Sequence, residues 1–332
     1  LHSGPVGCNA FLGGILRGYN SNLILSPTSP YSVIEADEYD RSFHRLSPHI
    51  AVITATDPDH LDIYGTEEAY LESFAHFTEL IQPGGFLVVH TGLKLVPRVH
   101  ESVRVYTFGR EEGDFHAANV RCGDGRIVFD FVYPGGTVAD IELGVPVAIN
   151  VDNAVASLAA VWLTGTLTPG LARRAMASYP GVERRFEFHL KEDGPCGRAV
   201  IDDYAHHPDE LRQSIASVRA LYPGRRLTVA FQPHLYSRTR DFAPQFAEAL
   251  DTADEVVLID LYPAREEPIP GISSKTIFDK LNCPHKSMIS KENFVDTMKN
   301  SNFEILLTAG AGDLNLYVPQ LVRALRTPDD CN

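Results

Sequence analysis

Short apolar runs recur along the chain and are separated by stretches with helical spacing. The first two runs are residues 32–34 (SVI) and 50–54 (IAVIT), and acidic residues follow each of them at once. Short β-rich runs bounded by Pro and polar clusters are typical of buried strands in an α/β sheet. We therefore expect these two runs to be neighbouring buried strands of one sheet.

Strand and helix patterns then alternate up to residue 180. Residues 67–80 carry apolar side chains at helical spacing, and residues 86–90 (FLVVH) have the pattern of a buried strand. This alternation predicts a parallel sheet. Three shorter strand patterns, expected to form a small appendage to the sheet, cover residues 104–108, 117–120 and 126–133. Two further helices are predicted at residues 149–163 and 169–178.

The second half of the chain repeats the α/β pattern. A helix is predicted from Asp209 to the turn at residues 222–224. Strands are predicted at residues 186–191, 199–202, 227–231, 255–259 and 304–307. This order indicates a second doubly wound sheet of the Rossmann type, although the sequence lacks a GxGxxG motif. We place a domain boundary at Tyr179-Pro180-Gly181, giving domains 1–180 and 181–332.

Composition agrees with two globular α/β domains and restricts the function. A chain of 332 residues holds about two domains at roughly 150 residues each. The net charge is −14 with no basic stripe, which argues against a nucleic-acid partner. No apolar run approaches the roughly 20 residues of a membrane span, and no signal peptide is apparent. The five cysteines form no CxxC pair, so neither a disulfide framework nor a zinc site is predicted, and a cytoplasmic protein is expected.

The first residues of the sequence resemble the interior of a folded domain rather than an N-terminus. It has no initiator Met, and residues 7–15 are apolar and Gly-rich. We expect the chain to be a piece of a longer protein. Gly13-Gly14 is predicted to be a turn, with close approach of the backbone to a ligand as the alternative.

Acidic residues and one imidazole follow the first two predicted strands. Ligands of open α/β sheets collect beyond the carboxyl ends of strands. The side chains expected in one such crevice are Glu35, Asp37, Glu38, Asp57, Asp59, His60 and Asp62. Mg²⁺ prefers oxygen ligands and substrate phosphates, so Glu35 is the first candidate ligand, and His60 can complete a site already charged by carboxylates. The alternative is that these acids cap helices or solvate a surface.

Eight segments of the sequence resemble the Mur ligase family. They are VIEADEYD, TDPDHLDIYG, NVDNAVASLAA, GVERRFEF, IDDYAHHPDE, FQPHLYSRTRDF, YPAREEPIPG and TAGAGDLN, in this order. The resemblance covers essentially the whole chain and implies the central ATPase domain and the C-terminal Rossmann-like domain of a three-domain enzyme. The DDYxHHP and FQPHxxxRT segments resemble the branch of the family that adds L-alanine.

The resemblance implies an ATP-dependent ligase of cytoplasmic peptidoglycan synthesis, and therefore of cell-wall biogenesis, cell shape and cell division. ATP would phosphorylate the carboxylate of UDP-N-acetylmuramate, and the amine of L-alanine would attack the acyl phosphate. Such chemistry needs positioning and charge neutralisation. The phosphate-loop pattern GxxxxGK[ST] is absent from the sequence, so we expect this chain to bind ATP poorly and to be an inactive fragment.

The family pattern also implies roles for particular residues. Glu35 matches the metal-binding Glu of the EADE motif, and His60 matches the His that contacts a second metal. Asn150 matches an adenine-contacting Asn. Two departures weaken these matches, because Ala55 stands where many relatives have Asn, and Ile149 stands where they have His. No lysine lies in the helix at 67–80, so the carbamylated lysine of the later ligases is not expected.

Four further matches lie in the second domain. Asp203 matches the acid that hydrogen-bonds the ribose of ATP. Tyr204, His206 and Arg238 match positions around the incoming alanine and the acyl phosphate, where a guanidinium binds carboxylate. His206 as an ordinary loop histidine and Arg238 as a solvated helix-start residue are the alternatives. Leu235 stands where many relatives have Arg.

Two other functions remain open on the sequence. One is the muropeptide-recycling ligase, which attaches a tripeptide to the same sugar, but its relatives lack the text found at residues 231–239. The other is a nucleotide-binding module without catalytic activity, for which the missing phosphate loop is the argument. Comparing L-alanine with the tripeptide as substrates of the full-length protein distinguishes the recycling ligase from the ligase that adds L-alanine.

Overall fold

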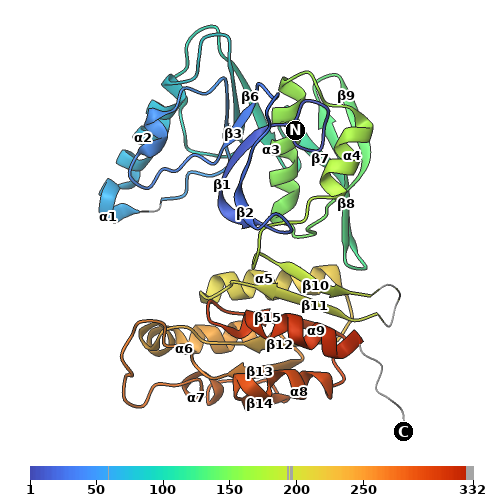
Figure 1. The fold of residues 1–332 in the computed structure, drawn as a ribbon. Coiled ribbons are helices and arrows are strands. Elements are labelled where there is room, and N and C mark those ends of the chain that lie inside the picture. The colour runs from blue at the N-terminus through green and yellow to red at the C-terminus, as the bar shows by residue number, and fades with distance from the viewer. Residues whose placement is uncertain (59, 193, 195–196, 327–332) are drawn as a thin grey trace. The chain divides into compact units, whose positions relative to one another are not determined.

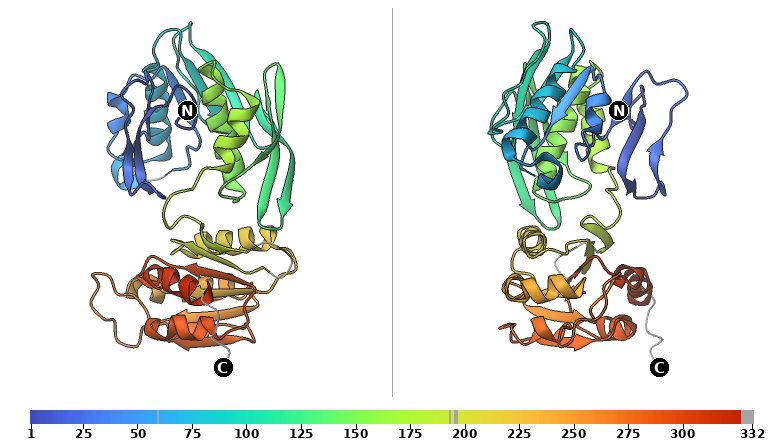
Figure 2. Two further views of the ribbon diagram at one scale, coloured as in Figure 1. Left: turned by 45° about the vertical axis from the view of Figure 1, so that its right-hand side comes forward. Right: turned by 90° about the vertical axis from the view of Figure 1, so that its left-hand side faces the viewer.

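A computed structural model describes residues 1–58, 60–192, 194 and 197–326 of the chain. The chain forms two compact units. The first unit comprises Leu1–Arg121 with Arg126–Pro180, and the second comprises Cys122–Gly125 with the chain from Gly181 onward. Figures 1 and 2 show a twisted sheet with helices against it in each unit.

The main sheet of the first unit has six strands in the order β4-β5-β6-β7-β8-β9. Strands β4 to β7 run parallel, whereas β8 and β9 pair antiparallel. The bounds of these strands are Ile50–Ile53 (β4), Phe86–His90 (β5), Arg104–Gly109 (β6), Phe115–Gly123 (β7), Arg126–Tyr133 (β8) and Gly136–Glu142 (β9). The predicted parallel sheet is therefore confirmed.

The prediction of a small appendage is wrong, because β6, β7 and β8 continue the main sheet. These strands carry large aromatic side chains whose burial in the core is favourable. The side chains of Phe108, Phe115, Phe129 and Phe131 are at most 1% exposed. Strand β9, which the sequence pattern did not indicate, closes the edge of this sheet beside β8.

Helices cover the main sheet of the first unit. Helix α2 (Glu67–Glu79) begins at Thr66, whose hydroxyl accepts the N–H of Ala69 at 3.2 Å. Helix α3 (Ile149–Leu163) packs on β4, β5, β6 and β8, and helix α4 (Pro169–Ala177) packs on β9. A short helix α1 (Leu61–Tyr64) and a 3₁₀ turn η1 (Ser42–Arg45) precede α2. The predicted long helices are confirmed.

Residues 32–34 do form a strand, but not in the predicted sheet. Strand β3 (Ser32–Ile34) pairs in parallel with β1 (Asn9–Leu16), which also pairs with β2 (Ser21–Ile24). All three residues of β3 are exposed. The prediction that residues 32–34 are a buried neighbour of β4 is wrong, because the described backbone partner of β3 is β1. Gly13 lies inside β1, so the predicted turn at Gly13-Gly14 is also wrong.

The second unit contains a six-stranded sheet in the order β10-β11-β15-β12-β13-β14. Strand β10 is antiparallel to β11, and the other five strands run parallel. The bounds are Glu187–Lys191 (β10), Ala199–Asp203 (β11), Leu227–Phe231 (β12), Glu255–Ile259 (β13), Lys286–Ile289 (β14) and Ile305–Ala309 (β15). The expected Rossmann-type sheet is confirmed, and β14 is an additional strand.

Helices lie on both faces of this sheet (Figure 2). Val200, Ala230 and Leu306 belong to one buried core together with α8 and α9. On the other strand face, the Phe231 ring lies 5.1 Å from that of Phe246 in α6. The helix bounds are Pro208–Leu221 (α5), Tyr236–Leu250 (α6), Lys275–Phe278 (α7), Phe294–Lys299 (α8) and Val318–Arg326 (α9). In the part of the chain that the structure describes, no helix could cross a membrane.

Candidate active-site residues in two units

Glu35 follows β3 and is held against β1. Its N–H donates to the carbonyl of Phe11 at 3.0 Å, and its carboxylate accepts the N–H of Gly13 at 2.7 Å. A Cβ on Gly13 would lie 2.7 Å from Glu35 Oε1, so a glycine is needed for this approach. The Glu35 side chain is exposed. One carboxylate group is thus oriented by the backbone while open to solvent.

His60 lies with a different acid. It precedes α1 in a left-handed backbone conformation, with φ of 52° and ψ of 40°. Its Nε2 is 3.6 Å from Glu38 Oε1, and its ring meets the edge of Tyr39 at 5.0 Å between centroids. The prediction that Glu35 and His60 follow neighbouring strands of one sheet is therefore wrong, because β3 and β4 belong to different sheets.

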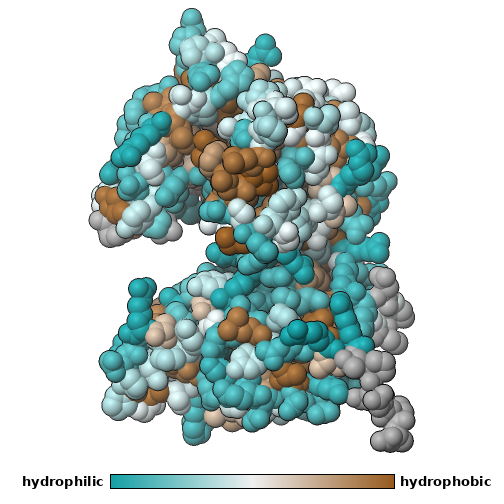
Figure 3. All heavy atoms as spheres, viewed as in Figure 1, coloured by the Kyte–Doolittle hydropathy of each residue, from teal (hydrophilic) through white to brown (hydrophobic). Residues whose placement is uncertain are grey.

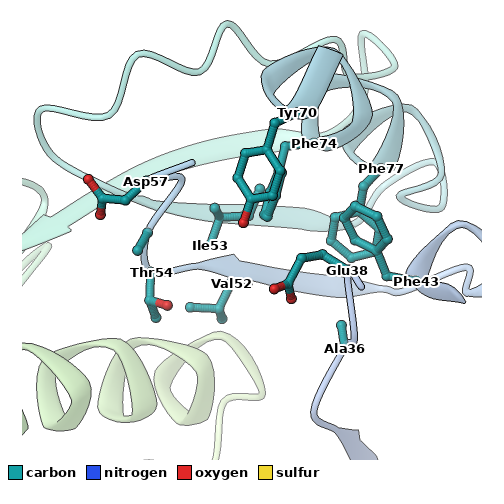
Figure 4. Close-up of a pocket in the computed structure, with 11 residues that line it drawn as sticks. Ala36, Glu38, Phe43, Val52, Ile53, Thr54, Asp57, Tyr70, Phe74 and Phe77 are labelled. Carbon is teal, nitrogen blue, oxygen red and sulfur yellow. The ribbon is translucent and has the colours of Figure 1, made fainter. Parts of the chain in front are cut away.

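A cavity of about 300 Å³ opens beside Glu38, between the end of β4 and helix α2 (Figure 4). Most of its lining residues are apolar, and Figure 4 shows Glu38 between Phe43 and Val52, with Asp57 at the opposite end. The lining residues are Ala36, Glu38, Phe43, Val52, Ile53, Thr54, Ala55, Asp57, Tyr70, Phe74 and Phe77. The cavity brings two of the predicted acids, Glu38 and Asp57, to one hollow.

The acids of the first unit fit a weakly chelated hard cation rather than a dedicated metal cage. Within the described ranges, no group of three or more His, Cys, Asp or Glu side chains could hold a metal ion. Mg²⁺ needs no such group, because it keeps several waters and binds one or two carboxylates plus substrate phosphates. The exposed carboxylate of Glu35 meets that requirement. Asp59 and the side chain of Asp62 lie outside what the structure describes.

Asn150 lies in the first turn of α3. Asn150 does not cap this helix, because the N-cap is Ala148 and no side chain caps it. The Asn150 amide donates instead to the carbonyl of Val145 at 3.0 Å, and its oxygen accepts the amide of Asn153 at 3.2 Å. Its amide is thus fixed at the start of a buried helix.

In the second unit, Asp203 ends β11 and is largely enclosed. Its carboxylate accepts the Ser214 hydroxyl and, at 3.4 Å, the N–H of Phe186. Burial raises the pKa of Asp203, and the hydrogen bond from Ser214 opposes that rise. Both oxygens therefore already have protein partners.

A chain of rings and charges runs from Tyr204 to Arg238. The ring centroids of Tyr204 and His206 are 5.0 Å apart, and those of His206 and His234 are 6.2 Å apart. Nη1 of Arg238 lies 3.5 Å from Nδ1 of His234. The structure thus brings three of the four predicted residues of this unit, Tyr204, His206 and Arg238, together near His234. Sequence reasoning gave His234 no role, although it stands in the FQPH segment.

His234 is held in its neutral form. Burial lowers the pKa of His234, and the positive charge of Arg238 lowers it further. The His234 ring also stacks on Tyr262, with centroids 5.9 Å apart and planes 15° apart. A neutral imidazole can accept a hydrogen bond from the Arg238 guanidinium.

Arg184 supports the same edge of the sheet. Its guanidinium lies over the Tyr204 ring at 4.7 Å and donates to the carbonyls of Gly310 and Gly312 at 2.8 and 3.2 Å. Tyr204 follows β11, and Gly310 follows β15. Arg184 therefore connects the ends of these two neighbouring strands. This arrangement at the carboxyl ends of parallel strands is that of a ligand site in a doubly wound fold.

Each unit is built on a mainly parallel sheet, and the cluster around His234 follows the carboxyl ends of its strands, as in α/β enzymes that bind their ligands there. The model of the Mur ligase middle domain matches residues 23–161, and that of the Mur ligase glutamate ligase domain matches residues 184–320. The chain belongs to the Mur ligase family.

Relatives and solved structures agree with this assignment. The chain is 56% identical to a UDP-N-acetylmuramate–L-alanine ligase of Phocaeicola vulgatus over 97% of this chain and 69% of that relative. It is 55% identical to the enzyme of the same name from Parabacteroides distasonis, over 96% and 68%. The crystal structure of the Thermotoga maritima UDP-N-acetylmuramate-alanine ligase superposes with a TM-score of 0.73 at 26% identity, covering 95% of this chain and 68% of that one.

A murein peptide ligase from Psychrobacter arcticus shares the fold alone. Its TM-score is 0.51 at 18% identity, with 96% of this chain and 71% of that one covered.

Proposed function

We propose that the protein is an ATP-dependent ligase that joins L-alanine to UDP-N-acetylmuramate in cytoplasmic peptidoglycan synthesis, with Mg²⁺ as its metal. The observation that carries the proposal is the 56% identity to a ligase of that specificity over 97% of the chain. The Tyr204, His206 and Arg238 cluster supports it, because an amino-acid substrate needs a cation for its carboxylate.

The first unit contributes phosphate and nucleotide chemistry in this proposal. Glu35 and His60 would hold magnesium, which supplies charge neutralisation when a carboxylate approaches the terminal phosphate of ATP. Asn150, fixed by Val145 and Asn153, would contact adenine through an amide already oriented. The carboxylate oxygen of UDP-N-acetylmuramate bonds to the γ-phosphorus while the bond to ADP breaks.

The second unit contributes the amino-acid half of the reaction. The Arg238 guanidinium would pair with the alanine carboxylate, and Tyr204 and His206 would border the reacting amine. Asp203 would accept a hydrogen bond from the ribose of ATP. The amine attacks the acyl carbon, an amide bond forms, and phosphate leaves with one oxygen of the former carboxylate.

Oxygen transfer tests this reaction sequence in the protein made from the complete open reading frame. UDP-N-acetylmuramate labelled with ¹⁸O in its carboxylate is incubated with ATP, Mg²⁺ and L-alanine, and the phosphate released is analysed by mass spectrometry. We expect one ¹⁸O atom in each phosphate. Unlabelled phosphate would contradict the acyl-phosphate route, and release of no phosphate would favour a nucleotide-binding module.

A further inference from the structure

Helix α6 carries Arg238 in its first turn but begins without a cap of its own. Its N-cap residue is Leu235, which has no side-chain acceptor. The first N–H groups of a helix need partners from elsewhere. One partner comes from a distant loop, where the Glu266 carboxylate accepts the N–H of Ser237 at 2.9 Å and also the Ser237 hydroxyl.

The loop that carries Glu266 is bonded to the segment between β12 and α6. The N–H of Tyr262 donates to the carbonyl of Pro233 at 2.8 Å, and the N–H of Leu235 donates to the carbonyl of Tyr262 at 3.0 Å. Leu235 has φ of 70° and ψ of 135°, a conformation that residues with a side chain rarely adopt. Such a conformation persists where surrounding contacts impose it. Here the loop at 262–266 supplies those contacts.

Charge adds to this arrangement. The hydrogen bonds from the Ser237 hydroxyl and N–H lower the pKa of Glu266, so its carboxylate is ionised at neutral pH. A negative charge is favourable at a helix N-terminus. Arg238 follows Ser237 directly, its guanidinium reaches His234, and the His234 ring stacks on Tyr262. The loop at 262–266 thus contacts both the turn that carries Arg238 and the ring of His234.

We infer that Glu266 is a positioning residue: by capping the turn that carries Arg238, it holds the guanidinium beside His234 in the orientation that receives the carboxylate of an amino-acid substrate. Glu266 needs no contact with that substrate. The identity of the substrate rests on the proposed function, whereas the positioning of Arg238 does not.

The first measurement needs no ligand. In the 332-residue protein, the mobility of the Arg238 side chain is followed through its Nε–Hε signal by NMR, with Arg238→Lys identifying the signal. We expect Glu266→Ala to lower the order parameter at least about twofold, toward that of a free side chain. Glu266→Gln keeps an acceptor for Ser237 and should retain an intermediate value. Glu267→Ala removes an exposed neighbouring acid and serves as the matched control.

The second measurement compares KM values in the protein from the complete reading frame. Glu266→Ala should raise the KM for L-alanine about tenfold and change the KM for ATP less than about twofold, whereas general destabilisation would move both. An Arg238 signal that stays ordered in Glu266→Ala overturns the inference. If Arg238 is released but the unsubstituted protein does not use L-alanine, the positioning stands and the proposed function fails.

Discussion

Asp202 is a buried carboxyl group, 3% exposed, inside the second sheet. One of its oxygens accepts the Thr308 hydroxyl at 2.5 Å, and the other has no hydrogen-bond partner among the described residues. Burial raises its pKa to about 6, although the Thr308 hydrogen bond opposes the rise. The native protein thus retains a proton that the unfolded chain loses at lower pH.

Replacing Asp202 by Asn should reveal this proton. Because the folded pKa is raised from 3.8 to about 6, the stability that protonated Asp202 provides is complete below pH 3.8 and is lost as the pH rises through 6. Asp202→Asn should therefore gain free energy of unfolding relative to the natural protein, by up to about 3 kcal/mol above pH 7 and little near pH 4. Urea denaturation across this range measures the difference.

The exposed Asp260 provides the control, since Asp260→Asn should leave the pH dependence of unfolding unchanged. A stability difference for Asp202→Asn that is the same at pH 4 and pH 7 would show that folding does not raise the pKa of Asp202.

Glu35 gives the second prediction at this scale. Glu35→Ala should lower ATP-dependent ligation about 10²- to 10³-fold, the usual effect of removing one group that stabilises transition-state charge. Stability should change by less than about 1 kcal/mol, because the lost hydrogen bond to Gly13 is exposed. Ligation rates at increasing Mg²⁺ measure the effect, with the exposed Glu101→Ala as control. An unaltered rate would exclude Glu35 as a metal ligand.

Single residues of the cluster differ in how far the sequence could predict them. Tyr204, His206 and Arg238 stand in motifs, and the fold does bring them to one edge of the sheet. His234 and Tyr262 lie in two loops that meet through a backbone bridge and a ring contact. No pattern in either loop indicates that contact, so sequence reasoning missed Tyr262 and Glu266.

At the scale of elements, the turn before α5 carries His206 of the cluster and the adjacent His207. The Glu210 carboxylate accepts the N–H groups of His206 and His207 at 2.9 and 3.1 Å. Burial alone would raise the pKa of Glu210, but these N–H donors outweigh it, and the pKa is lowered. The ionised side chain thus fixes the loop that delivers His206.

We expect Glu210→Ala to destabilise the protein by about 1 kcal/mol, the usual cost of losing a helix cap. It should also raise the KM for L-alanine, because His206 loses its anchor. Glu210→Gln keeps an acceptor and should lose less. Urea denaturation compared with Gln213→Ala, an exposed control on the same helix, measures the effect. Equal stability of Glu210→Ala and Gln213→Ala would contradict the capping role.

Long elements were predictable because their periodicity extends over several turns or a whole buried strand, as in α3 and β5. Strand β3 was assigned to the wrong sheet because three residues carry no information about their partner. Strand β1 was missed because Gly13 and Gly14 interrupt its pattern. At Gly13 a side chain would come close to the Glu35 carboxylate.

At the scale of the whole molecule, the residues proposed for phosphate chemistry and those proposed for amino-acid recognition lie mainly in different units of the chain. The first unit holds Glu35, His60 and Asn150, and the second holds Asp203, Tyr204, His206 and Arg238. The order of the motifs in the sequence predicted this division of candidate residues. Contacts that form only after the chain has folded, such as that of Glu266 with Ser237, were beyond it.

The choice of amino acid is the most direct test of the proposed ligase. The protein from the complete reading frame is incubated with UDP-N-acetylmuramate, ATP and Mg²⁺, together with either L-alanine or the tripeptide. The masses of the products are measured by mass spectrometry. We expect a product heavier by one alanyl residue, formed together with ADP and phosphate, and none with the tripeptide. A product formed only with the tripeptide would contradict the proposed function.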